Sequence, residues 1–252
     1  MMIQELPRYK RILEYLDKYD FATINSLSNL FSVSHMSVRR DLKYLQEKGL
    51  VNVSYGGQIK RSFLALTPLY DDKQSRFSES KKRIGQIAMS LLQPGMVIFI
   101  DGGTTMREFS ININIPLIVI TPDLHVAIEL SHRTEVKTLI CPGEIQASSL
   151  AAYNTQTMKY LSEQVIDLAF IGADGFSLDD GALTTNQIKA DCKWMAISRA
   201  VQSALLVDSS KNGLRCRYKI AGLDCFNYIV TEKKLTEKME KTLIRQDTKL
   251  IY

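Results

Sequence analysis

The chain has 252 residues, 45% hydrophobic and 23% charged, a composition that argues against wholesale disorder and suits a buried core. No apolar run reaches the roughly 18 residues of a transmembrane helix, and the start of the chain lacks the apolar stretch of a signal peptide. The net charge of +5 is unevenly placed: residues 1–61 hold 10 basic and 6 acidic side chains, whereas residues 62–252 hold 22 and 21. The four cysteines and three histidines show no metal-binding spacing. We therefore expect a cytoplasmic protein with reduced thiols, no metal and no cofactor.

The basic first quarter of the chain predicts three helices. An apolar stripe at helical spacing marks the first helix and consists of Tyr9, Ile12, Leu13 and Leu16. Thr23 is an N-cap for a short second helix, and Ser34 is an N-cap for a third helix that runs to about Lys48. Gly49 follows the third helix as the C′ residue that ends it.

The third helix separates apolar from basic side chains. Its inner face carries Val38, Leu42 and Leu45. Its opposite face carries Met36, Arg39, Arg40 and Lys43. A helix of this kind fits the major groove of DNA, where its cations reach base edges and phosphates. The same cluster is also compatible with a solvated helix face that has no ligand.

Two short strands follow the helices. Val51, Val53 and Tyr55 alternate with polar residues, Gly56-Gly57 is a turn signal, and residues 58–61 return as a second strand. Three helices and a two-stranded wing predict a winged helix-turn-helix domain over residues 1–61.

Residues 37–42 (Ser-Val-Arg-Arg-Asp-Leu) and Tyr55-Gly56-Gly57 resemble the N-terminal domain of the DeoR family of bacterial transcriptional regulators. The resemblance implies that Arg39 and Arg40 contact DNA, and we expect Asp41 to brace a neighbouring amide or arginine. The complete predicted DNA-binding set is Ser34, His35, Met36, Ser37, Arg39, Arg40, Lys43, Tyr55, Gly56 and Gly57.

The rest of the chain predicts a linker over residues 62–78 and a larger α/β domain over residues 79–252. The apolar runs expected to form strands are 96–100, 117–120, 136–140, 168–171, 204–207 and 228–230. An amphipathic helix begins near Ser80, and further helical stretches fall near 124–131, 155–165, 187–203 and 235–245. This alternation predicts a mostly parallel sheet that is covered on both faces.

Polar or glycine-bearing turns follow the predicted strands and should meet at one edge of the sheet. In the turn Asp101-Gly102-Gly103-Thr104-Thr105, the glycines let a ligand approach the backbone, and the threonines open the next helix, where free amides favour a phosphate. Lys193 and Lys211 are candidate positive partners of that phosphate. The same turn is also compatible with a tight βα connection that binds nothing.

The larger domain resembles the C-terminal sensor domain of DeoR-type regulators in five places: 101–105, 171–174, 181–185, Lys193 and 208–211. The resemblance implies a fold similar to ribose-5-phosphate isomerase, a phosphorylated sugar or related metabolite as effector, and homo-oligomerisation. The predicted effector-binding set is Asp101, Gly102, Gly103, Thr104, Thr105, Thr121, Asp174, Lys193, Asp208 and Lys211. Pro122, Cys141-Pro142-Gly143 and Lys189-Ala190-Asp191 depart from the family pattern and bear on the identity of the effector.

The function predicted from these features is a DNA-binding regulator, a repressor of a carbohydrate operon that binds a double-stranded operator and no membrane. The alternative is a sugar-phosphate isomerase-like enzyme with an appended DNA-binding domain. The catalytic pattern of that isomerase is missing, because Asp174 is followed by Gly175-Phe176 and no lysine precedes Gly181 in the later turn. A structural or protein-binding module explains neither the basic helix nor the glycine-threonine turn.

Overall fold

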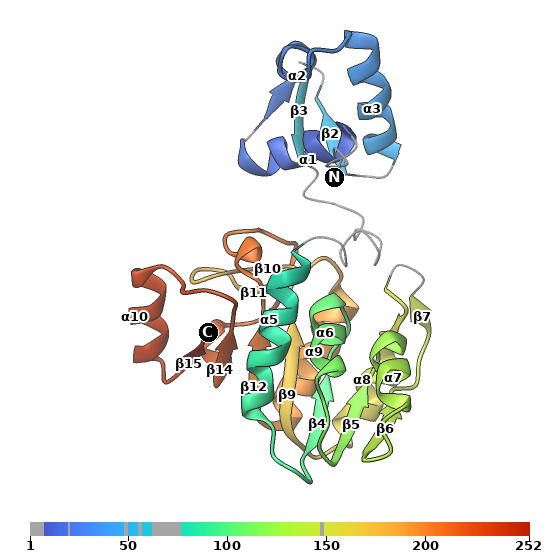
Figure 1. Cartoon of the computed structure of the whole chain (residues 1–252), viewed down its shortest axis with the longest axis vertical. Coiled ribbons are helices and arrows are strands. Elements are labelled where there is room, and N and C mark those ends of the chain that lie inside the picture. The colour runs from blue at the N-terminus through green and yellow to red at the C-terminus, as the bar shows by residue number, and fades with distance from the viewer. Residues whose placement is uncertain (1–7, 20, 48–49, 55–56, 62–76, 147–148) are drawn as a thin grey trace, which may run out of the picture. The chain divides into compact units, whose positions relative to one another are not determined.

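Figure 1 shows a computed structural model of the chain, which describes residues 8–19, 21–47, 50–54, 57–61, 77–146 and 149–252. Contacts between residues divide the chain into two compact units, residues 1–67 and 68–252, each with its own core. Within the described residues, no helix is both long and apolar enough to cross a membrane.

The N-terminal unit has three helices and a small antiparallel sheet, as expected of a winged helix-turn-helix. Its elements are α1 (Arg8–Lys18), β1 (Ala22–Thr23), α2 (Ile24–Phe31), α3 (His35–Glu47), β2 (Val51–Val53) and β3 (Gln58–Arg61). The prediction of two strands was incomplete, because β1 pairs with β3 and makes the strand order β1-β3-β2. A strand of two residues is too short to show an alternating pattern in the sequence.

Polar caps define where the helices of this unit begin. The Thr23 side chain accepts a hydrogen bond from the Ser26 amide, and the Ser26 hydroxyl in return accepts from the Thr23 amide. Ser34 Oγ accepts from the Ser37 amide at 3.3 Å, which confirms Ser34 as the cap of α3. After α3, the Leu50 amide donates to the Leu45 carbonyl at 2.8 Å, the long-range bond of a Schellman motif. Gly49 and residues 62–76 of the predicted linker 62–78 lie outside the described residues, and Ser78 already begins a helix.

A single apolar cluster holds these elements together. Its fully buried members include Ile12, Leu27, Val38, Leu45 and Ile59. Val38 and Leu45 lie on the inner face of α3, as predicted, so the opposite face of that helix is left to solvent.

The C-terminal unit is built on a seven-stranded parallel sheet with the order β15-β14-β12-β9-β4-β5-β6. Its strands are β4 (Val97–Ile100), β5 (Leu117–Thr121), β6 (Val136–Ile140), β9 (Ile166–Gly172), β12 (Ala200–Leu206), β14 (Tyr228–Val230) and β15 (Lys249–Ile251). Its α-helices are α5 (Ser78–Ala88), α6 (Thr104–Ile111), α7 (Leu124–Ser131), α8 (Thr155–Ser162), α9 (Gln187–Arg199) and α10 (Glu237–Arg245). The 3-10 helices η1 (Met89–Leu91), η2 (Ser209–Lys211) and η3 (Leu223–Cys225) complete the helical segments.

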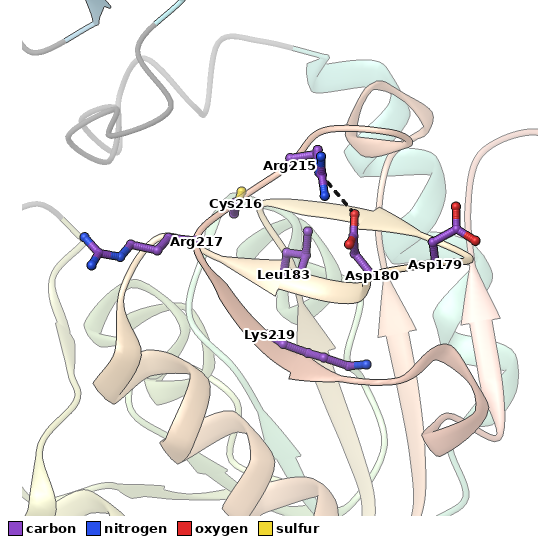
Figure 2. Close-up of a pocket in the computed structure, with 7 residues that line it drawn as sticks. All are labelled: Asp179, Asp180, Leu183, Arg215, Cys216, Arg217 and Lys219. Atoms are coloured by element: carbon purple, nitrogen blue, oxygen red, sulfur yellow. Dashed lines mark ion pairs between the residues drawn. The ribbon is translucent and has the colours of Figure 1, made fainter.

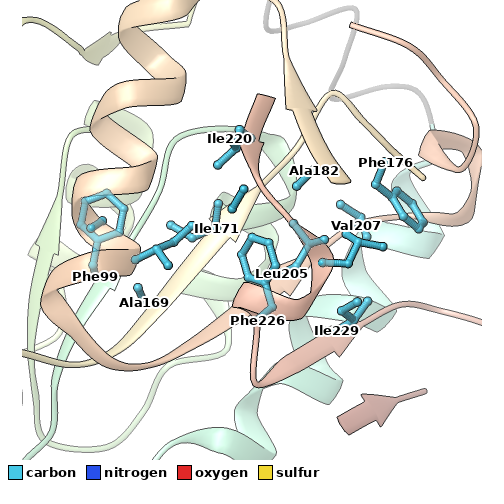
Figure 3. Close-up of a cluster of buried hydrophobic side chains, with 14 of the residues drawn as sticks. Phe99, Ala169, Ile171, Phe176, Ala182, Leu205, Val207, Ile220, Phe226 and Ile229 are labelled. Atoms are coloured by element: carbon cyan, nitrogen blue, oxygen red, sulfur yellow. The ribbon is translucent and has the colours of Figure 1, made fainter. Parts of the chain in front are cut away.

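Both faces of this sheet are buried, which confirms the predicted layered α/β fold. Figure 3 shows the cluster formed by one face, which includes Phe99, Ile171 and Leu205, and α8, α9 and α10 contribute to it. Helices α5, α6 and α7 cover the other face, which carries Ile98 and Phe170. Successive residues of one strand point to opposite faces, so each strand needs an unbroken apolar run.

Several elements were not predicted. A hairpin of β7 (Ile145–Gln146) and β8 (Ala151–Ala152) follows β6, and a second antiparallel sheet has the order β10-β11-β13. The strands of that sheet are β10 (Gly175–Ser177), β11 (Gly181–Thr184) and β13 (Tyr218–Ala221). The predicted helix over 187–203 was too long, because the chain becomes extended at Ala200, where β12 pairs with Ile166 of β9.

Candidate DNA-binding surface and effector site

The outer face of α3 presents three cations to solvent. Arg39, Arg40 and Lys43 are all exposed, and Met36 beside them is 71% exposed. Within the part of the chain that the structure describes, the side chains of these three cations form no ion pair. Their charge is therefore available to an external anion such as the DNA backbone.

An ion pair between two helices holds α3 in place. Arg8 on α1 donates from Nε to Asp41 Oδ2, and both side chains are largely buried. This is the arginine brace predicted for Asp41. The rings of Tyr9 and Tyr44 add a second contact between the same helices at a centroid distance of 5.2 Å.

The other predicted DNA contacts lie at the start of α3 and in the wing. Ser34 and His35 are exposed and Ser37 is half-buried at the N-terminal end of the helix. Gly57 has a φ of +73°, and its amide donates to Ser54 at 2.9 Å, so the wing reverses there. Tyr55 and Gly56 lie outside the described residues.

In the C-terminal unit, the turns after the parallel strands lie at one edge of the sheet, as predicted. Three hydrogen bonds join neighbouring turns. The Gly172 amide donates to Asp101 Oδ2 at 3.0 Å, the Gly103 amide donates to Asp123 Oδ2 at 2.9 Å, and the Cys141 amide donates to the Thr121 carbonyl at 2.8 Å.

Asp101 is the centre of this edge and is completely buried. Lys193 Nζ lies 2.6 Å from Asp101 Oδ2 and also donates to the Gly172 carbonyl at 2.7 Å. Tyr153 donates its hydroxyl to Asp101 Oδ1 at 2.7 Å. We predicted Asp101 and Lys193 as direct effector contacts. In the structure these two residues pair with each other, because a buried carboxylate and a buried ammonium each need an opposite charge.

Two further residues hold the loop and were missed in the sequence. The Tyr153 hydroxyl accepts a hydrogen bond from the Gly102 amide at 2.9 Å. Burial, and to a smaller extent the negative charge of the nearby Asp101, raise the pKa of Tyr153 well above its ordinary value. Asp123 caps α7 by accepting from the amides of His125 and Val126. Burial raises the pKa of Asp123, against the opposing effect of its three amide hydrogen bonds. An Asp directly before a predicted helix was a signal for Asp123, whereas Tyr153 belongs to no motif.

The start of α6 has no side-chain cap, which separates it from the starts of α7, α8, α9 and η2, although the start of α5 at Phe77 has none either. Side chains of Asp123, Asn154, Asn186 and Asp208 cap α7, α8, α9 and η2, whereas α6 begins at Gly103 without a side-chain cap. Uncapped first-turn amides are a natural anion site.

The two glycines of the loop have different surroundings: Gly102 is packed against Tyr153, whereas Gly103 faces open space. A Cβ on Gly102 would lie 2.6 Å from the Tyr153 hydroxyl, whereas a Cβ on Gly103, whose φ is +130°, would meet no atom within 4 Å. Thr104 is buried and Thr105 is half-buried at the beginning of α6. A ligand can therefore approach the backbone on the Gly103 side.

The remaining predicted effector residues lie at or after the ends of other strands of the sheet, and three of them accept hydrogen bonds from residues close by in the sequence. Thr121 is fully buried, and its Oγ1 accepts from the Asp123 amide at 3.2 Å. Asp174 accepts from the Thr184 hydroxyl at 2.8 Å. Asp208 accepts from the Ser210 amide at 3.1 Å, while the Lys211 side chain is half-buried on η2.

Figure 2 shows a separate surface hollow of about 360 Å³ on the small antiparallel sheet. It is lined by Asp179, Asp180, Leu183, Arg215, Cys216, Arg217 and Lys219. Arg215 Nε lies 3.4 Å from Asp180 Oδ2, so acidic and basic groups there offset each other in part. Sequence reasoning did not single out this hollow.

Among the described residues, no group of three His, Cys, Asp or Glu side chains is placed to hold a metal ion. All four cysteines are free thiols. Burial raises the pKa of Cys141 to about 12 and that of Cys192 to about 12, so both remain protonated at neutral pH.

A winged helix-turn-helix with exposed cations, joined to a parallel α/β unit with an open glycine loop, defines a DNA-binding regulator with a ligand-sensing domain. The DeoR-like helix-turn-helix domain matches residues 8–61, and the DeoR C terminal sensor domain matches residues 76–233. The chain belongs to the DeoR family of transcriptional regulators.

Several curated relatives share nearly the full length of the chain. An HTH-type transcriptional regulator of Haemophilus influenzae is 30% identical over 246 residues, which cover 96% of this chain and 95% of the relative. The HTH-type transcriptional repressor GlcR of Bacillus subtilis is 27% identical over 251 residues, 99% of this chain and 96% of that protein. The HTH-type transcriptional regulator GlpR of Haloferax volcanii is 28% identical over 231 residues, 90% of each chain. These relatives are regulators, which decides against the isomerase alternative.

Solved structures similar to the chain include ribose 5-phosphate isomerase A of Methanocaldococcus jannaschii, at 19% identity and a TM-score of 0.38 over 54% of each chain. Another is eIF2B delta of Chaetomium thermophilum, at 11% identity and a TM-score of 0.49 over 90% of this chain and 71% of that one.

Proposed function

We propose that this protein is a cytoplasmic repressor of a carbohydrate operon and releases its operator when a phosphorylated sugar or related metabolite binds the C-terminal domain. Residues 1–61 form the DNA-binding domain, residues 62–78 the linker, and residues 79–252 the effector-binding and oligomerisation domain. The observation that carries the effector assignment is the uncapped start of α6 behind an open glycine loop.

At the DNA end, α3 lies in the major groove. Arg39 and Arg40 reach base edges, and Lys43 contacts phosphates, because these cations are exposed on one face. Ser34, His35, Met36 and Ser37 line the end of the helix that enters the groove. The wing around Tyr55, Gly56 and Gly57 contacts the backbone.

At the effector end, the phosphate binds the amides of Gly103, Thr104 and Thr105 on the open side of the loop. Thr121 and Asp174 lie at the ends of the two strands beside β4, Asp208 and Lys211 lie one strand further along, and we propose that they bind the sugar and its phosphate. Asp101 and Lys193 act as positioning residues for Gly102, because their charges are already paired with each other.

Effector binding regulates transcription only if the DNA-competent and the released arrangements bind the effector with different affinity. We propose that the released arrangement of the homo-oligomer binds it more tightly. The near-neutral charge of residues 62–252 agrees with a domain that needs positive charge only at the loop.

The test is a thermal-shift screen of the full chain with sugar, polyol and sugar-acid phosphates, followed by operator binding with each ligand that raises Tm. A ligand at 100 times its Kd stabilises the native state by about 2.7 kcal/mol, which the screen detects. Thr105→Asp should abolish the response, because its carboxylate occupies the α6 amides. Thr155→Asp adds the same charge to the first turn of α8, which is already capped, and is the matched control.

A panel in which no phosphorylated compound raises Tm would overturn the effector assignment. An equal response by Thr105→Asp and wild type would overturn the position of the site.

A further inference from the structure

A second lysine of α9 is buried near Tyr153, the residue whose hydroxyl holds the loop. Lys189 and Lys193 are four residues apart on α9 and therefore lie on the same face of the helix. Their exposed fractions are 7% and 5%. Lys193 pairs with Asp101, and Lys189 lies against Ser149 and the ring of Tyr153.

Tyr153 links Lys189 to the loop, because it contacts Lys189 through its ring and Gly102 through its hydroxyl. Its Nζ lies 3.3 Å from the Ser149 hydroxyl and 5.4 Å from the centre of the Tyr153 ring. The hydroxyl of that ring accepts the Gly102 amide. Ser149 precedes β8 and Tyr153 follows it, so the hairpin and α9 together bring a cation and a hydroxyl to the side of Tyr153.

We propose that the effector carries a second anionic group, a carboxylate or a second phosphate at the other end of the sugar, and that Lys189 and Ser149 bind it. This inference rests on the proposed function, because it assumes that the first phosphate occupies the α6 amides. A cation in a site sheltered from water interacts more strongly with an anion than the same cation does in bulk solvent. A site that hydrogen-bonds a ligand group also discriminates against the analogue that lacks it.

The experiment is titration calorimetry on the full chain with two pairs of probes. Glucose 6-phosphate and 6-phosphogluconate differ by a carboxylate, and fructose 6-phosphate and fructose 1,6-bisphosphate differ by a phosphate. We expect the doubly anionic member of at least one pair to bind about tenfold tighter or more. The pair that shows the preference identifies the second group.

Lys189→Gln should reduce that preference to about one, and Lys189→Arg should restore most of it because the charge is kept. Lys159→Gln removes an exposed lysine from α8 and should keep the wild-type preference. Should Lys189→Gln fail to fold, Ser149→Ala removes the hydroxyl partner alone and should reduce the preference severalfold.

The inference is overturned if singly phosphorylated sugars bind as tightly as their doubly anionic partners, or if Lys189→Gln keeps the wild-type preference. In both cases the proposed phosphate site stands. If none of the four probes binds and the wider phosphate panel also fails, the proposed function itself is overturned.

Discussion

The two units use positive charge in opposite ways. On α3, Arg39, Arg40 and Lys43 project into solvent, whereas on α9, Lys189 and Lys193 are more than nine-tenths buried. An exposed cation costs little to maintain and can meet a large polyanion from outside. A buried cation needs a fixed partner within the fold, as Lys193 has in Asp101, so its removal disturbs the structure itself. Exposure therefore separates cations that recognise DNA from cations that shape a pocket.

The largest effect expected from this contrast is on the Asp101–Lys193 pair. Asp101→Asn leaves the Lys193 ammonium buried without its counter-ion and should lower the free energy of unfolding by about 3–5 kcal/mol. Urea unfolding followed by the fluorescence of Trp194, the single tryptophan, measures it.

Combining Asp101→Asn with Lys193→Met is the control, because it removes both charges. The double variant should be less destabilised than the sum of the two single variants. If Asp101→Asn unfolds at the same urea concentration as wild type, the pair is not the structural centre of this edge.

On α3 the expected effect is on binding and not on folding. Arg40→Ala should weaken operator binding by about 1–3 kcal/mol and relax specificity at one base pair, while Tm is unchanged because the side chain is exposed. Fluorescence anisotropy with operator and mismatched duplexes measures both. Arg245→Ala removes an exposed arginine from α10 and is the matched control.

Lys43→Ala distinguishes a phosphate contact from base readout. It should weaken binding to all sequences alike and reduce the slope of log Kd against log salt concentration by about one, the value for one lost phosphate contact. Unchanged operator affinity for both Arg40→Ala and Lys43→Ala would mean that this face of α3 is only a solvated surface.

The elements that could be predicted are those whose local pattern agrees with their packing. The apolar stripe of α1 and the apolar strands could be predicted because burial of one face or of both faces sets the spacing of apolar residues in the sequence. Thr23 and Ser34 could be predicted because a cap is a single polar residue directly before a helix. Strand β1 and the β7–β8 hairpin have two residues per strand, which is too short for a repeating apolar pattern in the sequence.

The site was only partly predictable for a related reason. The glycine-threonine turn is contiguous, so residues 101–105 could be found together. Tyr153 and Asp123 reach the loop from two other segments, Lys189 lies against the Tyr153 ring from a third, and only the folded sheet edge brings them together. The pairing of Lys193 with Asp101, 92 residues apart, is likewise a product of the fold.

The buried thiols make a pH-dependent prediction for the C-terminal unit. The pKa values of Cys141 and Cys192 are raised from 9.0 to about 12 by burial, so above pH 9 the unfolded thiols ionise while the folded ones keep their protons. The folded state then binds more protons, and the free energy of unfolding should fall by about 1 kcal/mol per thiol for each pH unit above 9. Urea unfolding from pH 8 to 10.5 measures the slope.

Because lysines and tyrosines also titrate in this range, the comparison is with the double variant Cys141→Ala/Cys192→Ala. Its stability should fall less steeply with pH than that of the wild type. Parallel slopes for the two proteins would show that these thiols ionise equally in both states.

The smallest expected effect concerns the brace between α1 and α3. Arg8 and Asp41 are 27% and 15% exposed, so solvent screens their attraction in part. Arg8→Ala should reduce the stability of α3 by less than about 1 kcal/mol, which hydrogen exchange of its amides can resolve. Because Arg8 orients the helix without facing DNA, the salt dependence of operator binding should stay unchanged. A loss of salt dependence equal to that of Lys43→Ala would place Arg8 on the DNA and extend the exposed basic surface of this unit to α1.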